Sequence, residues 1–398
     1  MQQPPKAAWP LRRKKLIDFG WNSPTPTYLR DYFAQIEKSG FDGVGIKLPD
    51  EAGAGFVFDI KKNAKINPEA RAAQAKILNA LPRSQKLTHN FLIVHGTSTL
   101  DWFSDKDWAV AEEHLRWCAR TAKVAKLAGI FWDAEPYNGF PHWSYSSQPQ
   151  KAKYSFLDYY QQIRKRGAQF IKAVQEEFPG LTIFSLRQLS DFQDGSPFSA
   201  HLLPSKDPVA LQKGLSEAWW GLHAAFTNGI FDTIVPGVTF VDGNEDAYYY
   251  TSALDFERIV RVLKGDALAL VAPENRPRYA RQYQISHAVS VDYTVGNWAE
   301  AIEAFPDYLR KQGKALTPEQ RAQWFEHNLY HALRTADEYV WVYSEDMSWW
   351  ENRKIPPGYT DALSTARRKV ETNAPLGFDI ETTLRSVRET LRMGKGRG

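Results

Sequence analysis

The stretch Gly129-Ile-Phe-Trp-Asp-Ala-Glu-Pro-Tyr137 begins as a short apolar run and ends in two carboxylates, a proline and a tyrosine. A short apolar run of this kind is typical of a buried β-strand. Residues two apart on a strand point to the same side, so Asp133 and Glu135 are expected to share one face. A strand that only filled a core would have little reason to end in this way. The end of this strand is therefore the first candidate for a functional site.

The same arrangement recurs along the chain, because strand-like segments alternate with helix-like segments. The expected strands are residues 14–21, 41–48, 89–96, 129–137, 181–188, 231–243, 284–294 and 337–345. The expected helices are residues 23–40, 67–81, 105–129, 156–178, 215–229, 254–265 and 317–334. Such alternation predicts a parallel sheet covered by helices. Eight units without a GxGxxG or GxxxxGK phosphate-binding motif favour a single-domain α/β fold, a (β/α)8 TIM-type barrel.

The two ends of the chain differ from this pattern. Residues 1–13 are rich in proline and glutamine and are expected to be flexible, residues 14–390 to form the barrel, and residues 391–398 to be a disordered tail. The start MQQPPKAAWPLRRKK has no apolar signal core and is typical of the front of a mature exported protein. A secreted or periplasmic location is therefore expected.

Composition excludes several classes of protein. Hydrophobic residues make up 43% and charged residues 24%, and the net charge of +4 is too small to indicate a nucleic-acid or membrane partner. No apolar run approaches the ~20 residues of a membrane-spanning helix. The single cysteine, Cys118, excludes an intramolecular disulfide and a thiolate metal cluster, and is expected to be a buried structural thiol. Nothing in the sequence specifies an oligomeric state.

Acidic residues follow several of the expected strands, at the end where barrel enzymes place their active sites. Besides Asp133 and Glu135, they are Asp18, Asp242, Glu245, Asp292, Glu345 and Asp346. The fourth and eighth strands are opposite in an eight-stranded ring, so Glu345 is expected to face Glu135 across the mouth. Two nearby carboxylates raise the pKa of at least one, which lets it donate a proton near neutral pH. For Asp242 a turn-forming role at the Asp-Gly pair is the stronger interpretation.

Large aromatic residues gather in the same loops. They include Trp21, Tyr137, Trp143, the run Tyr248–Tyr250, Trp349 and Trp350. So many rings in polar loops are costly unless they pack or bind something. Flat rings beside carboxylates suit carbohydrates, whose C–H faces stack on aromatics while their hydroxyls bind charged groups.

These features together resemble a (β/α)8-barrel glycoside hydrolase. The segments that carry the resemblance are FGW at 19–21, WDAEPY at 132–137, VDGNE at 241–245 and YSEDMSWW at 343–350. The chain is most similar to a poorly characterised bacterial family of such barrels. The resemblance implies hydrolysis of glycosidic bonds in an oligo- or polysaccharide by two carboxylates, without a cofactor or metal.

The resemblance also implies roles for particular residues. In many retaining barrel glycosidases the acid/base follows strand four, which is Glu135 here. The nucleophile usually follows strand seven, where this chain has Asp292, whereas Glu345 follows strand eight. The partner of Glu135 is therefore open among Glu345, Asp292 and Glu245.

The expected site has two parts. Glu135, Glu345 and Asp133 are the candidate catalytic residues. The candidate substrate-binding residues are Trp21, Tyr137, Trp143, Glu245, Tyr249, Asp292, Trp349 and Trp350.

Two other interpretations remain. A metal-dependent barrel enzyme acting on a sugar could use His89 and His95, which flank the third strand, with Asp133 or Glu135. We expect these two histidines on opposite faces of the strand, which argues against a shared ion. His327 and His331 lie four apart on a helix, but on the outer ring, away from the mouth. The third interpretation is a non-catalytic carbohydrate-binding barrel, which would need the aromatic residues but not several carboxylates.

Overall fold

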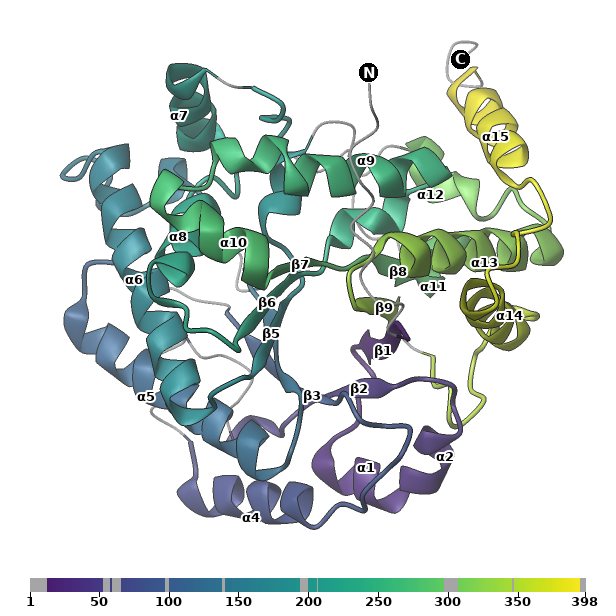
Figure 1. Ribbon diagram of the computed structural model, residues 1–398, viewed down its shortest axis with the longest axis horizontal. Helices are drawn as coiled ribbons and strands as arrows, with labels where there is room; N and C mark the ends of the chain where they lie inside the picture. Colours follow the sequence, from purple (N-terminus) through teal and green to yellow (C-terminus); the bar gives the residue numbers. More distant parts are fainter. Residues whose placement is uncertain are drawn as a thin grey trace.

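A computed structural model describes residues 13–52, 58, 66–96, 100–137, 140–193, 200–205, 207–296, 307–345 and 347–393. Nine strands form one sheet at the centre of the molecule (Figure 1). They are β1 Lys15–Gly20, β2 Gly43–Ile46, β3 Phe91–His95, β4 Gly129–Asp133, β5 Thr182–Ser185, β6 Thr239–Asp242, β7 Tyr283–Ile285, β8 Ala288–Ser290 and β9 Tyr339–Ser344.

Each pair of neighbouring strands is parallel, in the order β7-β6-β5-β4-β3-β2-β1-β9-β8. The two outer strands of this order, β7 and β8, are consecutive in the chain and are separated only by Ser286 and His287. The Ser286 backbone N–H donates to Asp242 on one side, and the His287 carbonyl accepts from Trp341 on the other. The sheet therefore closes into a barrel whose seventh position is one strand broken into two halves.

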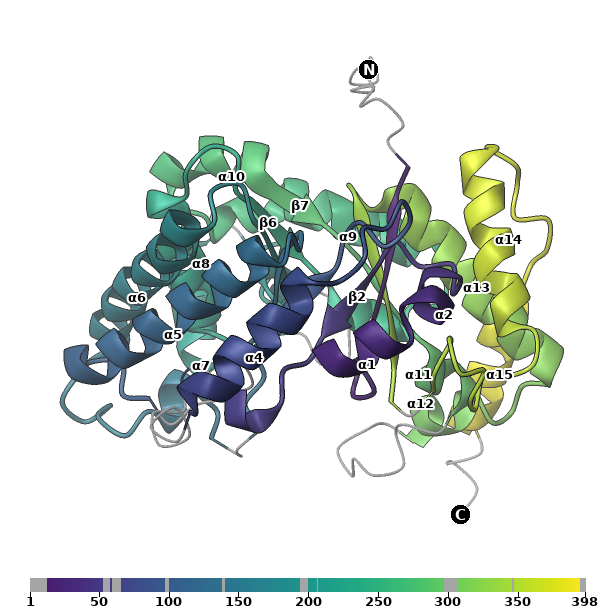
Figure 2. The same cartoon turned by 90° about the horizontal axis from the view of Figure 1, so that it is seen from below.

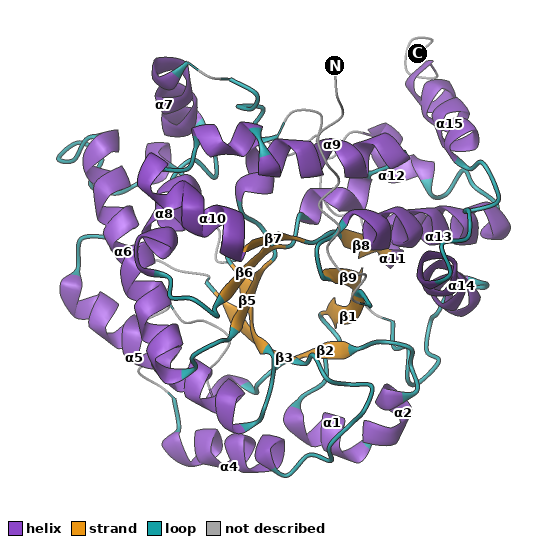
Figure 3. Ribbon diagram, viewed as in Figure 1, coloured by secondary structure: helices purple, strands orange, loops and turns teal. Residues whose placement is uncertain are grey.

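Helices surround this ring of strands on the outside (Figure 3). They are α1 Pro26–Asp31, α2 Phe33–Glu37, α4 Pro68–Asn79, α5 Asp105–Val124, α6 Phe156–Glu177, α7 Pro208–Glu217, α8 His223–Thr233, α9 Ala253–Lys264, α10 Arg276–Gln282, α11 Val291–Val295, α12 Asp307–Gln312, α13 Pro318–Thr335, α14 Tyr359–Glu371 and α15 Glu381–Met393. Figure 2 shows α4, α5 and α6 side by side on one flank and α13, α14 and α15 on the other. This is a single-domain (β/α)8 barrel, as the alternation of segments predicts.

Local sequence signals explain where several helices begin. Asn67 caps α4 by accepting from two backbone N–H groups, and Pro68 fills its first turn. Thr317 and Gln320 form the reciprocal capping box at α13. Both starts were expected from the sequence and are confirmed.

Two apolar cores flank the sheet, because side chains alternate along each strand. On β4, Ile130 and Trp132 pack in the core under the helices, whereas Phe131 packs inside the barrel. The Phe131 ring lies 5.0 Å from Phe91 and 4.4 Å from Phe184 inside the barrel. These rings fill the lower part of the barrel interior. Asp133 and Glu135 alternate in step with Phe131, so their side chains also point inward, above these rings.

The structure differs from the expected elements at several places, three of which bear on the site. The expected helix 215–229 is two helices, α7 and α8, which are separated by residues 218–222. The expected strand 231–243 is the end of α8 followed by a short β6. The end of the expected strand 284–294 is helical, since Ser290 caps α11 and turns residues 291–295 into it.

Two further observations concern the ends of the chain and its surroundings. Helix α15 continues through Met393, three residues into the segment expected to be a tail, and residues 394–398 lie outside the described residues. Within the described ranges, no helix is both long and apolar enough to span a membrane.

Candidate active site

A cavity of about 720 Å³ opens at the carboxyl ends of the strands. This volume lies in the range of small-molecule binding sites. The residues that line it are Phe19, Gly20, Trp21, Lys47, Ile93, His95, Asp133, Glu135, Pro136, Tyr137, Leu186, Arg187, Trp219, Trp220, Glu245, Tyr248, Tyr249, Tyr343 and Glu345. The cavity therefore combines several carboxylates with an aromatic wall.

Asp133 organises the strand-four side of the cavity. Its Oδ1 accepts the backbone N–H of Glu135 at 3.0 Å, and its Oδ2 accepts the Tyr137 hydroxyl at 2.6 Å. The same Oδ2 lies 3.1 Å from Nδ1 of His95 on the neighbouring strand. Asp133 is only 1% exposed, so these contacts hold it in place and orient Glu135.

Arg187, which follows β5, is the central cation of the site. Its Nε lies 3.0 Å from Glu135, and its Nη2 lies 3.4 Å from Glu245. Its Nη1 lies 3.1 Å from Asp191 and 3.7 Å from Asp246. The single positive charge of this guanidinium is thus shared among four carboxylates and cannot neutralise all of them.

This imbalance acts on the protonation of the two glutamates. Burial raises the pKa of Glu135, Arg187 lowers it, and Asp133 raises it, so that the net direction is upward. Burial also raises the pKa of Glu245 well above its usual range, and Arg187 offsets only part of this effect. The site therefore favours a protonated carboxyl beside Arg187, which is the state that a proton donor requires.

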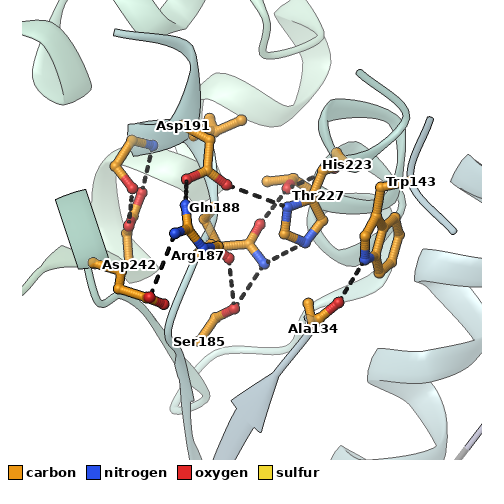
Figure 4. A network of polar contacts seen from close by, with 12 residues as sticks. Ala134, Trp143, Ser185, Arg187, Gln188, Asp191, His223, Thr227 and Asp242 are labelled. Atoms are coloured by element: carbon orange, nitrogen blue, oxygen red, sulfur yellow. Dashed lines mark hydrogen bonds and ion pairs between the residues drawn. The ribbon is translucent and has the colours of Figure 1, made fainter. Parts of the chain in front are cut away.

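A buried polar network holds Arg187 from behind (Figure 4). The Ser185 hydroxyl donates to the Arg187 carbonyl at 2.8 Å, and the Gln188 amide donates to Ser185 at 2.9 Å. The Gln188 amide also lies 3.1 Å from Nε2 of His223. Burial and, as a smaller effect, the Arg187 charge together lower the pKa of His223 to about 3, so this imidazole is neutral. Arg187 is therefore held in place by the hydrogen bond to its backbone carbonyl and by the ion pairs of its guanidinium with the surrounding carboxylates.

Asp242, at the end of β6, takes a structural position. Its carboxylate accepts the Ser190 N–H at 2.9 Å, the Ser190 hydroxyl at 2.7 Å and the Asn244 N–H at 2.9 Å. It is fully buried and does not line the cavity. These contacts agree with the turn-forming interpretation.

Glu345 enters the cavity from the strand opposite β4. Its Oε1 accepts the Tyr343 hydroxyl at 2.6 Å. Its backbone N–H donates to Oδ2 of Asp292 at 2.8 Å. β9 and β4 are four positions apart in either direction around the ring, counting β7 and β8 as one position. Glu345 and Glu135 therefore line one cavity from strands on opposite sides of the ring.

The aromatic wall is built around Trp21, whose side chain is 46% exposed. Its ring stacks on His95 at 6.1 Å with an interplanar angle of 8°, and the Tyr137 ring meets its edge at 5.3 Å. The ammonium of Lys47 lies 5.6 Å from the centre of the indole. On the strand-five side, the Trp220 ring lies 5.5 Å from the Arg187 guanidinium. Flat apolar faces thus lie beside charged groups on two sides of the cavity.

The structure brings most of the expected site residues to this cavity, but not all of them. Those that line it are Asp133, Glu135, Glu345, Trp21, Tyr137, Glu245 and Tyr249. The expected residues that do not line it are Trp143, Asp292, Trp349 and Trp350.

The positions of these four correct the expectation. Trp143 is 1% exposed and donates from Nε1 to the Ala134 carbonyl at 2.8 Å, so it fills the core beneath its own loop. Trp349 is packed in the core against Phe41 and Phe325.

The other two do not line the cavity either. Trp350 is half-buried against the core, with its ring 6.5 Å from Tyr28. Asp292 lies in the first turn of α11 rather than at a strand end, and it binds the backbone of Glu345. Trp349 and Trp143 pack against residues of helices distant in the sequence, Phe325 of α13 and Phe226 of α8, which no local pattern specifies. Asp346 lies outside the described residues.

Of the two histidines of the metal interpretation, His95 ends β3, whereas His89 lies two residues before the strand begins. His95 is in the cavity wall. The His89 ring lies 5.8 Å from the ring of Tyr339, the first residue of β9. The expectation of opposite faces was wrong, since positions six apart have the same parity. The length of the strand separates them instead, at roughly 20 Å for six residues.

Several cavity residues were not expected from the sequence. Arg187 closes the expected strand 181–188, and attention to basic as well as acidic residues at strand ends would have found it. Tyr343 has the parity of Glu345, which is also a readable signal. Trp219 and Trp220 reach the cavity only because the helix expected around them breaks between α7 and α8.

No model of a known protein family matches this sequence, and no curated protein matches it either. Among solved structures, a GH5_18 protein from Streptomyces cattleya in complex with GlcNAc is 14% identical, covering 91% of this chain and 82% of that one, with a TM-score of 0.45. A GH5 xyloglucanase from Bacteroides ovatus in complex with a XXXG heptasaccharide is 10% identical over 89% of this chain and 75% of that one, with a TM-score of 0.44. A glucosidase from Croceicoccus marinus is 9% identical over 90% and 68%, with a TM-score of 0.42.

These neighbours are glycoside hydrolases, but identities and TM-scores this low carry no argument about this chain. The barrel assignment rests on its own strand pairing. The candidate site rests on the contacts described above.

Proposed function

We propose that this protein is a glycoside hydrolase that acts on an oligo- or polysaccharide with Glu135 and Glu345 as its two carboxylates. The observation that carries the proposal is their placement on opposite strands of one aromatic-walled cavity. A glycosidase needs its two acids on either side of the scissile bond.

Glu135 is the proposed general acid, which gives its proton to the leaving oxygen. Its raised pKa and its hydrogen-bonded backbone suit this role. Asp133 is a positioning residue, because its carboxylate is used by Glu135, Tyr137 and His95.

Glu345 is the proposed nucleophile, or the base that activates water. The Tyr343 hydroxyl binds one of its oxygens, and Asp292 holds its backbone. Separation of the carboxyl groups decides the outcome, since about 5 Å implies retention and roughly 6.5–9.5 Å implies inversion. Glu245 is the rival partner, but it shares Arg187 with Glu135 on the same side of the cavity.

The cavity walls support a substrate longer than one sugar. A second pocket of about 220 Å³ adjoins the main cavity and shares Trp21, Lys47 and Tyr137 with it. Trp21 therefore stands between two spaces, where it can stack on one sugar while another lies beyond it. A polymeric substrate also fits the secreted or periplasmic location expected from the sequence.

The test is turnover by the purified chain on a panel of polysaccharides and aryl glycosides. Glu135→Gln and Glu345→Gln should each lower turnover by roughly 100-fold or more while sugar binding persists. Glu257→Gln, an exposed change on α9, serves as the matched control. Equal turnover in Glu135→Gln and the parent would refute the assignment.

The same experiment separates the rival interpretations. Sugar binding without any turnover by the parent would favour a non-catalytic barrel. A larger loss in Glu245→Gln than in Glu345→Gln would make Glu245 the partner of Glu135. The anomer released first, followed by NMR, reports retention or inversion.

A further inference from the structure

A group of metal-ligand side chains lies on the outer layer of the barrel, away from the cavity. Among the described residues, His327 and His331 of α13 and Glu381 of α15 are the group of three or more His, Cys, Asp or Glu side chains close enough to share an ion. One ligand atom from each lies within 4.8 Å of the others. Two histidines four apart on a helix present their rings on one face, which is a common zinc-binding arrangement.

The hydrogen bonds of His327 leave its other nitrogen directed at a carboxylate. Nδ1 of His327 lies 2.9 Å from Oδ1 of Asn328. The Asn328 amide nitrogen donates to the Tyr250 carbonyl at 3.2 Å, so the amide oxygen must be the atom that faces the imidazole. Nδ1 of His327 therefore carries the hydrogen, and the lone pair of the neutral ring is on Nε2.

Nε2 of His327 lies 3.0 Å from Oε1 of Glu381. Two acceptors at this distance repel each other unless a cation lies between or beside them. That cation is a proton or a metal ion.

The neighbouring contacts favour the metal ion. The His331 ring lies 4.5 Å from the His327 ring and offers another nitrogen. Oε1 of Glu381 already accepts the Ala253 N–H at 2.7 Å, which orients the carboxylate as outer contacts orient ligands in metal sites.

We propose that His327, His331 and Glu381 bind one Zn²⁺ ion that fastens α15 to α13. Two imidazoles and one carboxylate suit zinc, with water as the fourth ligand. Ligand atoms of tetrahedral zinc lie roughly 3.4 Å apart for bonds of about 2.0–2.1 Å, so closure requires only small side-chain movements.

Such an ion has a structural task at this place. Among the described residues of α15, Leu384 is buried and Val387 is partly buried against the same apolar cluster. Glu381 is its first residue and already contacts α9 through Ala253. A metal ion would join α9, α13 and α15 at one point, independently of the chemistry in the cavity.

The test is calorimetric titration of Zn²⁺ into the full chain after chelator treatment. One ion per chain is expected, and zinc at 100 times its dissociation constant should raise Tm by about 3 °C for a chain of this length. His331→Ala and Glu381→Gln should lose both effects. His89→Ala, a half-buried histidine outside the group, should keep them.

The Glu381→Gln variant guards against a trivial loss of folding. Its amide oxygen can still accept the Ala253 N–H, so its Tm in EDTA should equal that of the parent. Co²⁺ should give a tetrahedral visible absorption band in the parent and not in His331→Ala. Absence of zinc binding by the parent, or unchanged stoichiometry in His331→Ala, would overturn the proposal in favour of a bound proton.

Discussion

Asp18 should make the stability of this protein fall as the pH rises from about 4 to about 7. It lies on β1 between Ile17 and Phe19, whose side chains fill the barrel interior, so its own carboxyl points into the helix layer. It is 1% exposed. Burial raises its pKa from 3.8 to about 7, and the Trp349 indole offsets this only slightly.

The sign and size follow from proton linkage. The folded chain holds a proton on Asp18 between about pH 4 and 7, where the unfolded chain has lost it. Stability is therefore fully present below pH 4 and is lost as the pH rises through the folded pKa. For pKa values of 3.8 and about 7, the free energy of unfolding falls by roughly 2.5 kcal/mol between pH 5 and pH 8.

The assay is urea unfolding of the parent and of Asp18→Asn at these two pH values. Asn cannot ionise, so between pH 5 and pH 8 the free energy of unfolding of Asp18→Asn should fall by about 2.5 kcal/mol less than that of the parent. Taking the difference between the two pH values removes any loss of packing caused by the substitution itself. Asp361→Asn, an exposed change at the start of α14, should keep the dependence of the parent. If the parent and Asp18→Asn change in parallel, Asp18 titrates normally and the argument from burial is wrong.

Three further changes test the cavity. Arg187→Gln removes the cation beside Glu135 and should move the alkaline limb of the pH profile of kcat/KM upward by roughly one to three units; an unmoved limb would mean that Glu135 is not the proton donor. Trp21→Ala should raise KM about tenfold, as expected for a lost stacking contact of about 1.4 kcal/mol, with little change in Tm. Trp349→Ala should instead lower the free energy of unfolding by about 3–5 kcal/mol. A larger loss of stability in Trp21→Ala than in Trp349→Ala would contradict their placement. Exhaustive EDTA treatment should leave turnover intact, because among the described residues the cavity acids form no group close enough to share one ion. Loss of activity that one divalent metal restores would instead make His95 and Asp133 ligands.

Much of the fold could be predicted from local pattern. Alternating apolar strands and amphipathic helices indicate the barrel, and the capping residues at Asn67 and Thr317 mark helix starts correctly. Parity along a strand places Asp133 and Glu135 on one face. It also places Glu345 across the ring, once the strands are counted. These features depend only on residues close together in the sequence, because side chains alternate in the same way along any strand.

The rest was decided by contacts between distant parts of the chain. Trp143 and Trp349 follow strands in the sequence, as the exposed Trp21 does, yet they are buried in the core. Asp292 became a helix residue when the seventh strand broke to pair with β6 and then with β9. The role of Arg187 depends on strands four, five and six lying side by side, because this brings Glu135 and Glu245 to one guanidinium. A sequence shows which side of a strand a residue occupies, but the packing of loops and helices determines what that residue meets there.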